Sequence, residues 1–201
     1  MSWIKCIEPE QAEGKLRQLY ERVSHPEHGI DNILLVHSLR PHTLLGHMTL
    51  YKNVLHHRDN VLPKWYLEAI GVYVSILNGC SYCTDHHGEG LRKLLPDEPS
   101  YQRIKQALSQ ESFSTVLTPA FAAGMVYAKQ LTIAPAEDLS DLVATMRTHG
   151  LDDGMILELN QVVSYFNYAN RTANGLGVNT EGDALGLSPG DNDNPENWSH
   201  T

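Results

Sequence analysis

The chain has 201 residues, 41% of them hydrophobic and 19% charged, which suits a folded domain with a sizeable core. Its 24 acidic and 15 basic side chains give a formal charge of −9, so nucleic acid and anionic membrane surfaces are not expected partners. The sequence has no apolar run of about 18 residues for a membrane span, no secretory signal, and only three cysteines, so we expect a cytoplasmic protein without a disulfide scaffold.

Amphipathic and apolar patterns predict helices through nearly the whole chain. Pro41 and Pro63 suit first helical turns, Gly150 suits a C-terminal cap, and Asp152 or Asp153 can cap the last helix. The short apolar run at 31–39 fits a helix or a strand. Helices are expected at 9–23, 41–56, 63–77, 80–94, 119–131, 137–149 and 152–173, and residues 100–109 form a weakly amphipathic piece.

Two segments define the expected organisation of the chain. The helix at 63–77 is apolar on most sides, which is typical of a buried helix, and Asn78 with Gly79 breaks it. After Gly175 the composition shifts to Gly, Asp and Asn. We therefore predict a single helical domain over 1–178 and a loosely ordered acidic tail over 179–201, in which Trp198 is the one large anchor and could dock on a neighbouring subunit.

The chemistry is expected at Cys80 and Cys83, which are separated by Ser81 and Tyr82. With Asn78 or Gly79 as the cap, Cys80 would lie in the first turn of a helix, where free N–H groups and the helix dipole favour a thiolate. Two cysteines three residues apart can form a disulfide.

Two further side chains are candidates for proton transfer. His87 follows Cys83 by four residues and should lie one turn along the same face, where an imidazole can accept a thiol proton. Glu68 would be about 18 Å from Cys80 on one straight helix. If the chain folds back at Gly79, Glu68 lies about 16 Å before the break and His87 about 12 Å after it, so the two would meet.

Other interpretations of these residues remain open. Cys80, Cys83 and His87 could bind zinc together with a fourth ligand. Attachment of haem is not expected, because Thr84 rather than His follows Cys83. The protein could also be an assembly protein that keeps a vestigial site. Asp85 and His86 are expected to face the solvent.

The spacing Glu68, Cys80, Cys83, His87 resembles the active-site signature of alkylhydroperoxidase D, within the carboxymuconolactone decarboxylase superfamily. The segment from Tyr165 to Val178 is similar to the closing helix of the peroxidase-related branch. The resemblance covers residues 8–178, and the central motif is its most specific part. It implies an all-α helical bundle, a homo-oligomer, and no metal or organic cofactor.

The resemblance also implies the roles of the site residues. Cys83 would be the thiol attacked by a peroxide, passing through a sulfenic acid. Cys80, nearer the surface, would resolve it as an internal disulfide that an external thiol reductant protein then opens. Glu68 and His87 would relay protons. The expected activity is that of a peroxidase-like thiol oxidoreductase acting on a peroxide or disulfide substrate. The best-known peroxidases of the family carry His where this chain has Tyr82.

Overall fold

The structure is a computed structural model and describes residues 2–190, 194, 197 and 198. It is all-helical over these residues, as the patterns predict, and the run at 31–39 contains a helix rather than a strand. The α-helices are α1 (Gly14–Val23), α2 (Asn32–Leu35), α3 (Pro41–Leu55), α4 (Lys64–Leu77), α5 (Ser81–Leu94), α6 (Glu98–Gln110), α7 (Pro119–Ile133), α8 (Ser140–Thr148) and α9 (Asp153–Leu176). Two 3₁₀ turns, Pro9–Gln11 and Phe113–Thr115, complete the described elements.

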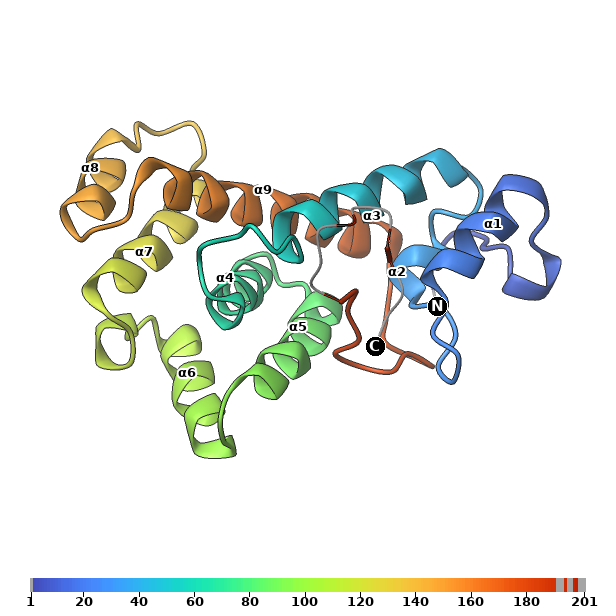
Figure 1. Cartoon of the computed structure of the whole chain (residues 1–201), viewed down its shortest axis with the longest axis horizontal. Helices are drawn as coiled ribbons and strands as arrows, with labels where there is room; N and C mark the ends of the chain where they lie inside the picture. The colour runs from blue at the N-terminus through green and yellow to red at the C-terminus, as the bar shows by residue number, and fades with distance from the viewer. Residues whose placement is uncertain (1, 191–193, 195–196, 199–201) are drawn as a thin grey trace.

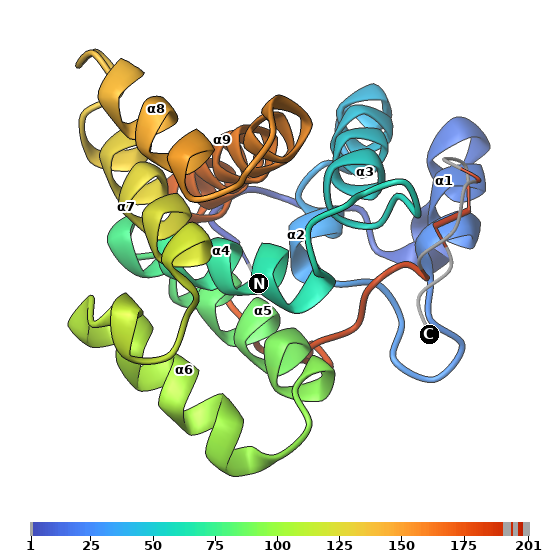
Figure 2. The same ribbon diagram turned by 60° about the vertical axis from the view of Figure 1, so that its left-hand side comes forward.

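Helix α4 is the centre of the structure. It packs against α5, α7 and α9, and α9 runs past it along the length of the molecule with α3 beside it (Figures 1 and 2). Every residue from 66 to 75 is buried, which confirms the burial expected from the apolar run. The chain turns back at Gly79, whose φ of +62° favours glycine, and α5 then packs on α4. This turn positions the candidate site.

The contact between α4 and α9 depends on a glycine. A Cβ atom on Gly71 would meet the ring of Phe166 at 2.1 Å, so no larger residue fits without moving that ring. Gly71→Ala should therefore lower the free energy of unfolding by about 1–3 kcal/mol, despite the better helix propensity of alanine. Urea denaturation measures this change.

Gly46 provides the matched control for this substitution. It lies within α3, and a Cβ atom there has no neighbour within 4 Å. Gly46→Ala should raise the free energy of unfolding by about 0.5–1 kcal/mol. Equal effects of the two alanines would contradict the close packing of α4 on α9.

The chain after α9 has no helix or strand over residues 179–190, but it makes specific contacts. Asn32 donates from its side chain to the carbonyl groups of Asn179 and Glu181, at 2.9 and 3.0 Å. Trp198 is 2% exposed and packs beneath the guanidinium of Arg22, 3.8 Å from the ring centroid. The expectation that Trp198 docks on a neighbouring subunit is therefore wrong, because its ring is covered by its own chain. Residues 191–193, 195, 196 and 199–201 of the expected tail lie outside the described residues.

None of the described helices is long and apolar enough to cross a membrane.

Candidate active site

The cysteine pair lies where α5 begins. Cys80 is itself the N-cap of the helix, and its sulfur accepts the Cys83 N–H at 3.4 Å. The sequence placed Cys80 in the first turn with Asn78 or Gly79 as the cap. Instead, Asn78 ends α4, Gly79 makes the turn, and the sulfur of Cys80 does what a Ser or Asp side chain does at most helix starts. The sulfur therefore receives a backbone donor directly.

The two thiols differ in acidity. The hydrogen bond from the Cys83 side chain, together with the Cys83 N–H and the nearby Asn170 amide, lowers the pKa of Cys80 to about 7 against the opposing effect of burial. The pKa of Cys83 is raised well above its ordinary value by its hydrogen bond with Cys80 and by burial. Cys80 therefore has the greater thiolate character of the two, and Cys83 keeps its proton at neutral pH.

Both thiols of the pair are buried. Cys80 is 1% exposed and Cys83 is 4% exposed, so exposure does not distinguish them. Cys80 is covered by an apolar cluster that includes Val36, Ala173 and Val178. Cys83 lies on the wall of a cavity of about 170 Å³. The thiol accessible to a small molecule is therefore Cys83.

The fold-back at Gly79 brings Glu68 and His87 together, as the helix geometry predicts. Oε2 of Glu68 lies 2.7 Å from Nδ1 of His87, and the carboxylate is 4% exposed while the imidazole is 17% exposed. Burial favours the neutral acid, but the charge and hydrogen bond of His87 outweigh it and lower the pKa of Glu68. A carboxylate held in this way fixes the imidazole tautomer with its proton on Nδ1 and leaves Nε2 as an acceptor.

Aromatic side chains hold the His87 ring in place. Phe166 and Tyr51 meet it edge to face, with centroids 4.6 and 6.2 Å away. No hydrogen bond joins His87 to either thiol in the described part of the chain. His87, Glu68 and Cys83 instead line the same cavity, so a proton would pass between sulfur and imidazole through a water or a bound substrate.

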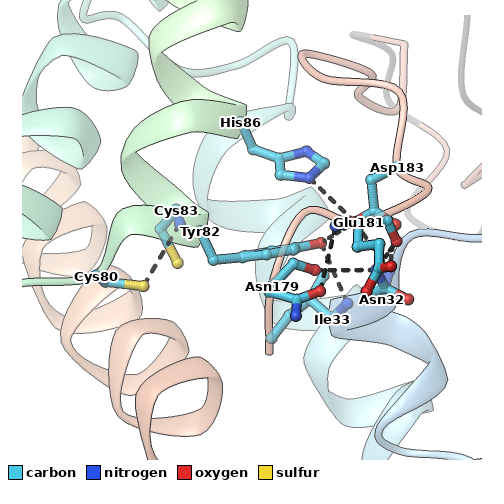
Figure 3. Close-up of polar contacts among 9 residues, drawn as sticks. All are labelled: Asn32, Ile33, Cys80, Tyr82, Cys83, His86, Asn179, Glu181 and Asp183. Atoms are coloured by element: carbon cyan, nitrogen blue, oxygen red, sulfur yellow. Dashed lines mark hydrogen bonds and ion pairs between the residues drawn. The ribbon is translucent and has the colours of Figure 1, made fainter. Parts of the chain in front are cut away.

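Tyr82, between the cysteines, joins a second polar network that the sequence did not reveal. Its hydroxyl donates to Oδ2 of Asp183 at 2.8 Å and accepts the Ile33 N–H at 3.2 Å (Figure 3). Nε2 of His86 lies 3.1 Å from the same Asp183 oxygen, and the Asn32 N–H donates to both Asp183 oxygens at 3.2 and 3.1 Å. The hydroxyl of Tyr82 is thus committed to Asp183, away from the thiols.

His86 is buried at 7% exposure, so the expectation that it faces the solvent is wrong, whereas Asp85 is exposed as expected. The segment that follows α9 covers His86 through Asp183, and the sequence pattern of α5 does not predict this contact. The same segment continues over the cavity, where Gly186, Leu187 and Ser188 form part of the wall. Lys93 holds it there by donating to the carbonyl groups of Leu185 and Gly186, at 3.4 and 3.0 Å.

The zinc interpretation finds no geometric support. Among residues 2–190, 194, 197 and 198, no three side chains of His, Cys, Asp or Glu converge in a way that could hold a metal ion.

No protein-family model and no curated protein matches the chain. Solved structures do. A peroxidase-related protein from Ralstonia eutropha JMP134, described as an alkylhydroperoxidase AhpD core, is 23% identical over 90% of this chain and 94% of its own, with a TM-score of 0.76. A peroxidase-related protein from Silicibacter sp. TM1040 is 24% identical over 82% of this chain and 85% of its own, with a TM-score of 0.70.

The debrominase Bmp8 is a more distant match. Its complex with 2,3,4-tribromopyrrole is 16% identical over 89% of this chain and 93% of its own, with a TM-score of 0.66. Because the fold supports more than one named activity, the reaction has to be argued from the site. The arrangement of α1 to α9 is that of the alkylhydroperoxidase AhpD fold.

Proposed function

We propose that this protein is a peroxidase-like thiol oxidoreductase that reduces a peroxide through Cys83 and Cys80, with Glu68 and His87 as the proton relay. The observation that carries the proposal is the hydrogen bond from Nδ1 of His87 to Glu68, at the edge of a cavity whose wall also contains the Cys83 thiol. A carboxylate, an imidazole and a thiol in this order are what a thiol needs to be activated at neutral pH.

In the first step the Cys83 proton passes to Nε2 of His87, and Glu68 stabilises the imidazolium. The Cys83 sulfur attacks the terminal oxygen of the hydroperoxide, the O–O bond breaks, and the leaving alkoxide takes the proton back from His87 to become an alcohol. Cys83 is then a sulfenic acid.

In the second step the Cys80 thiolate attacks the Cys83 sulfur and displaces hydroxide, which takes a proton and leaves as water. The lowered pKa of Cys80 supports this role, because a thiolate is the nucleophile in disulfide formation. An external dithiol protein then reduces the Cys80–Cys83 disulfide, as expected for a protein working in a reducing cytoplasm. We include a homo-oligomer in the proposal and no metal or organic cofactor.

The test is mass spectrometry of the reduced protein after one equivalent of an organic hydroperoxide. We expect the loss of two hydrogens, localised to the peptide that contains Cys80 and Cys83. Cys6→Ser should give the same product, because Cys6 lies outside the cavity that contains Cys83.

Cys83→Ser should give no internal disulfide and no consumption of peroxide. A dithiol that stays unchanged in the parent protein would overturn the proposal. Consumption of peroxide at equal rates by Cys83→Ser and the parent would instead favour an assembly protein with a vestigial site.

A further inference from the structure

A buried amide lies between the closing helix and the cysteine turn, and the proposed reaction does not use it. Asn170, on α9, is 0% exposed, so its side chain must find partners for one oxygen and two N–H groups inside the protein. Its Oδ1 accepts from Nδ2 of Asn78 at 2.9 Å, and its Nδ2 donates to Oγ of Ser75 at 3.0 Å. These two bonds tie α9 to the end of α4.

The orientation of this amide is fixed by its neighbours. The Ser75 hydroxyl donates to the Gly71 carbonyl at 2.7 Å, so it has no proton left and can only accept from Asn170. The atom of Asn170 that faces Ser75 must therefore be the nitrogen, and the oxygen must face Asn78. Ser75 takes one of the two N–H groups, which leaves the second N–H for another acceptor.

The second N–H is directed at the cysteine pair. The Ser75 carbonyl accepts the Cys80 N–H at 2.9 Å, which places Ser75 beside the cysteine turn. Ala173, about one turn after Asn170 on α9, packs in the apolar cluster that contains both cysteines. The hydrogen bonds of the Asn170 side chain to the two thiols lower the pKa of Cys80 and that of Cys83.

A donor at this position is needed because a thiolate is costly in so apolar a site. The Cys83 N–H already bonds to the sulfur of Cys80, and no backbone N–H in the described part of the chain bonds to the sulfur of Cys83. Asp85 on α5 opposes a thiolate by charge repulsion, which raises the pKa of Cys80. Tyr165 on α9 stays protonated, because burial raises its pKa well above the ordinary value. His87 lies on the cavity wall with Cys83 but makes no hydrogen bond to it within the described residues.

We infer that Asn170 is the residue that stabilises the thiolates of the cysteine pair, donating its second N–H to whichever sulfur carries the negative charge. In the reduced protein that sulfur belongs to Cys80. Resting on the proposed function, the same N–H then stabilises the sulfur of Cys83 after that thiol has lost its proton and while it attacks the peroxide.

Titration of the reduced protein tests this inference without any peroxide. The ultraviolet absorbance of the thiolate is followed against pH, and a variant in which both Cys80 and Cys83 are replaced by serine is the blank. Asn170→Leu has nearly the same size but no donor, so the midpoint for Cys80 should rise from about 7 to about 8. Asn170→Asp keeps the size and the acceptor for Asn78 but brings a negative charge, so its midpoint should rise at least as far. The aspartate variant decides the test if leucine prevents folding.

Asn167→Leu is the matched control, because it changes the same kind of side chain about one turn earlier on α9. The Asn167 amide donates to the Thr132 hydroxyl and to the Val163 carbonyl, and it makes no bond to either cysteine in the described part of the chain. The midpoint of this variant should stay at about 7. A midpoint that is unchanged in both Asn170 variants, or that rises equally in Asn167→Leu, would overturn the inference.

A pH–rate profile links Asn170 to the reaction. For hydroperoxide-driven formation of the Cys80–Cys83 disulfide, Asn170→Leu should slow the rate about tenfold at low pH, where few thiols are ionised, and little at high pH. A loss of equal size at every pH would overturn the role of Asn170 in the reaction. If peroxides fail to oxidise the cysteines but the midpoint rises as expected, the proposed function is wrong and the thiolate assignment stands. If the parent reacts with peroxide and neither Asn170 variant changes the midpoint, the reverse holds.

Discussion

Glu68→Gln should slow hydroperoxide-driven formation of the Cys80–Cys83 disulfide about 100- to 1,000-fold. Glutamine keeps the size of the side chain and can still accept the Nδ1–H of His87, so the imidazole keeps its position. What is lost is the negative charge that stabilises the imidazolium while the thiol proton is on Nε2. In a site where Glu68 is 4% exposed, water cannot replace that charge.

The rate is measured by mixing reduced protein with hydroperoxide, quenching with an alkylating agent, and counting free thiols by mass spectrometry. Glu137→Gln removes the same charge from an exposed side chain and should leave the rate unchanged. An unchanged rate in Glu68→Gln would show that His87 works without its carboxylate and that the contact at 2.7 Å is structural only.

The sequence could predict this half of the site because its geometry is local. A helix begins after Pro63, it ends at Asn78, and Gly79 makes the turn into the next helix. If the second helix folds back along the first, positions at similar distances from the turn meet, which places Glu68 beside His87. The rise per residue of a helix is the only quantity required.

The second network could not be predicted because its partners are far apart in the sequence and lack a periodic pattern. Asp183 lies in a segment rich in Gly, Asp and Asn, a composition that carries no helical or strand signal. Its contact with Tyr82 spans 101 positions, and its contact with Asn32 spans 151. Similarly, the pattern of α5 shows that His86 is polar but not that another segment covers it.

The N-cap position of Cys80 differs from the prediction for another reason. Asn78 and Gly79 are both common at helix ends, and cysteine is rarely used as an N-cap, so local preferences favour Asn78 or Gly79 as the cap. The glycine was needed for the turn itself, since its φ is +62°. Cys80, the next residue, is therefore the N-cap, and its sulfur rather than an amide lies at the positive end of α5.

Asp183→Ala should lower the free energy of unfolding by about 3 kcal/mol. The carboxylate is 4% exposed and is bonded to the Asn32 N–H, the Tyr82 hydroxyl and His86, so alanine leaves several buried polar groups without a partner. For a chain of this length the expected fall in Tm is about 6–12 °C. Differential scanning calorimetry measures the change.

Glu181→Ala is the matched control, because it removes an acidic side chain two residues earlier in the same segment. Glu181 is exposed, and it reaches Asn32 through its backbone carbonyl, which alanine retains. Its Tm should stay within about 1 °C of the parent. A similar loss in both variants would mean that the segment needs negative charge rather than the specific bonds of Asp183.

Asp183→Ala should also expose the cavity that contains the Cys83 thiol. Asp183 ties residues 179–183 to the cysteine turn, and the chain then continues to Gly186, Leu187 and Ser188 on the cavity wall. Without that bond the stretch keeps the bonds from the Asn32 side chain to the Asn179 and Glu181 carbonyl groups and the bond from Lys52 to the Gly190 carbonyl. Between these points it is held by Lys93 on two carbonyl groups, which is a weak surface contact. Limited proteolysis should therefore cut Asp183→Ala within residues 179–190 faster than it cuts Glu181→Ala.

Tyr82→Phe removes the hydrogen bond between Tyr82 and Asp183 by deleting its donor instead of its acceptor. If Asp183 stabilises the fold through Tyr82, the effects of Tyr82→Phe and Asp183→Ala on the free energy of unfolding should not add in the double variant. Full additivity would place the stabilising effect of Asp183 on Asn32 and His86 instead. In that case Tyr82 would not be the residue that connects the C-terminal segment to the redox turn.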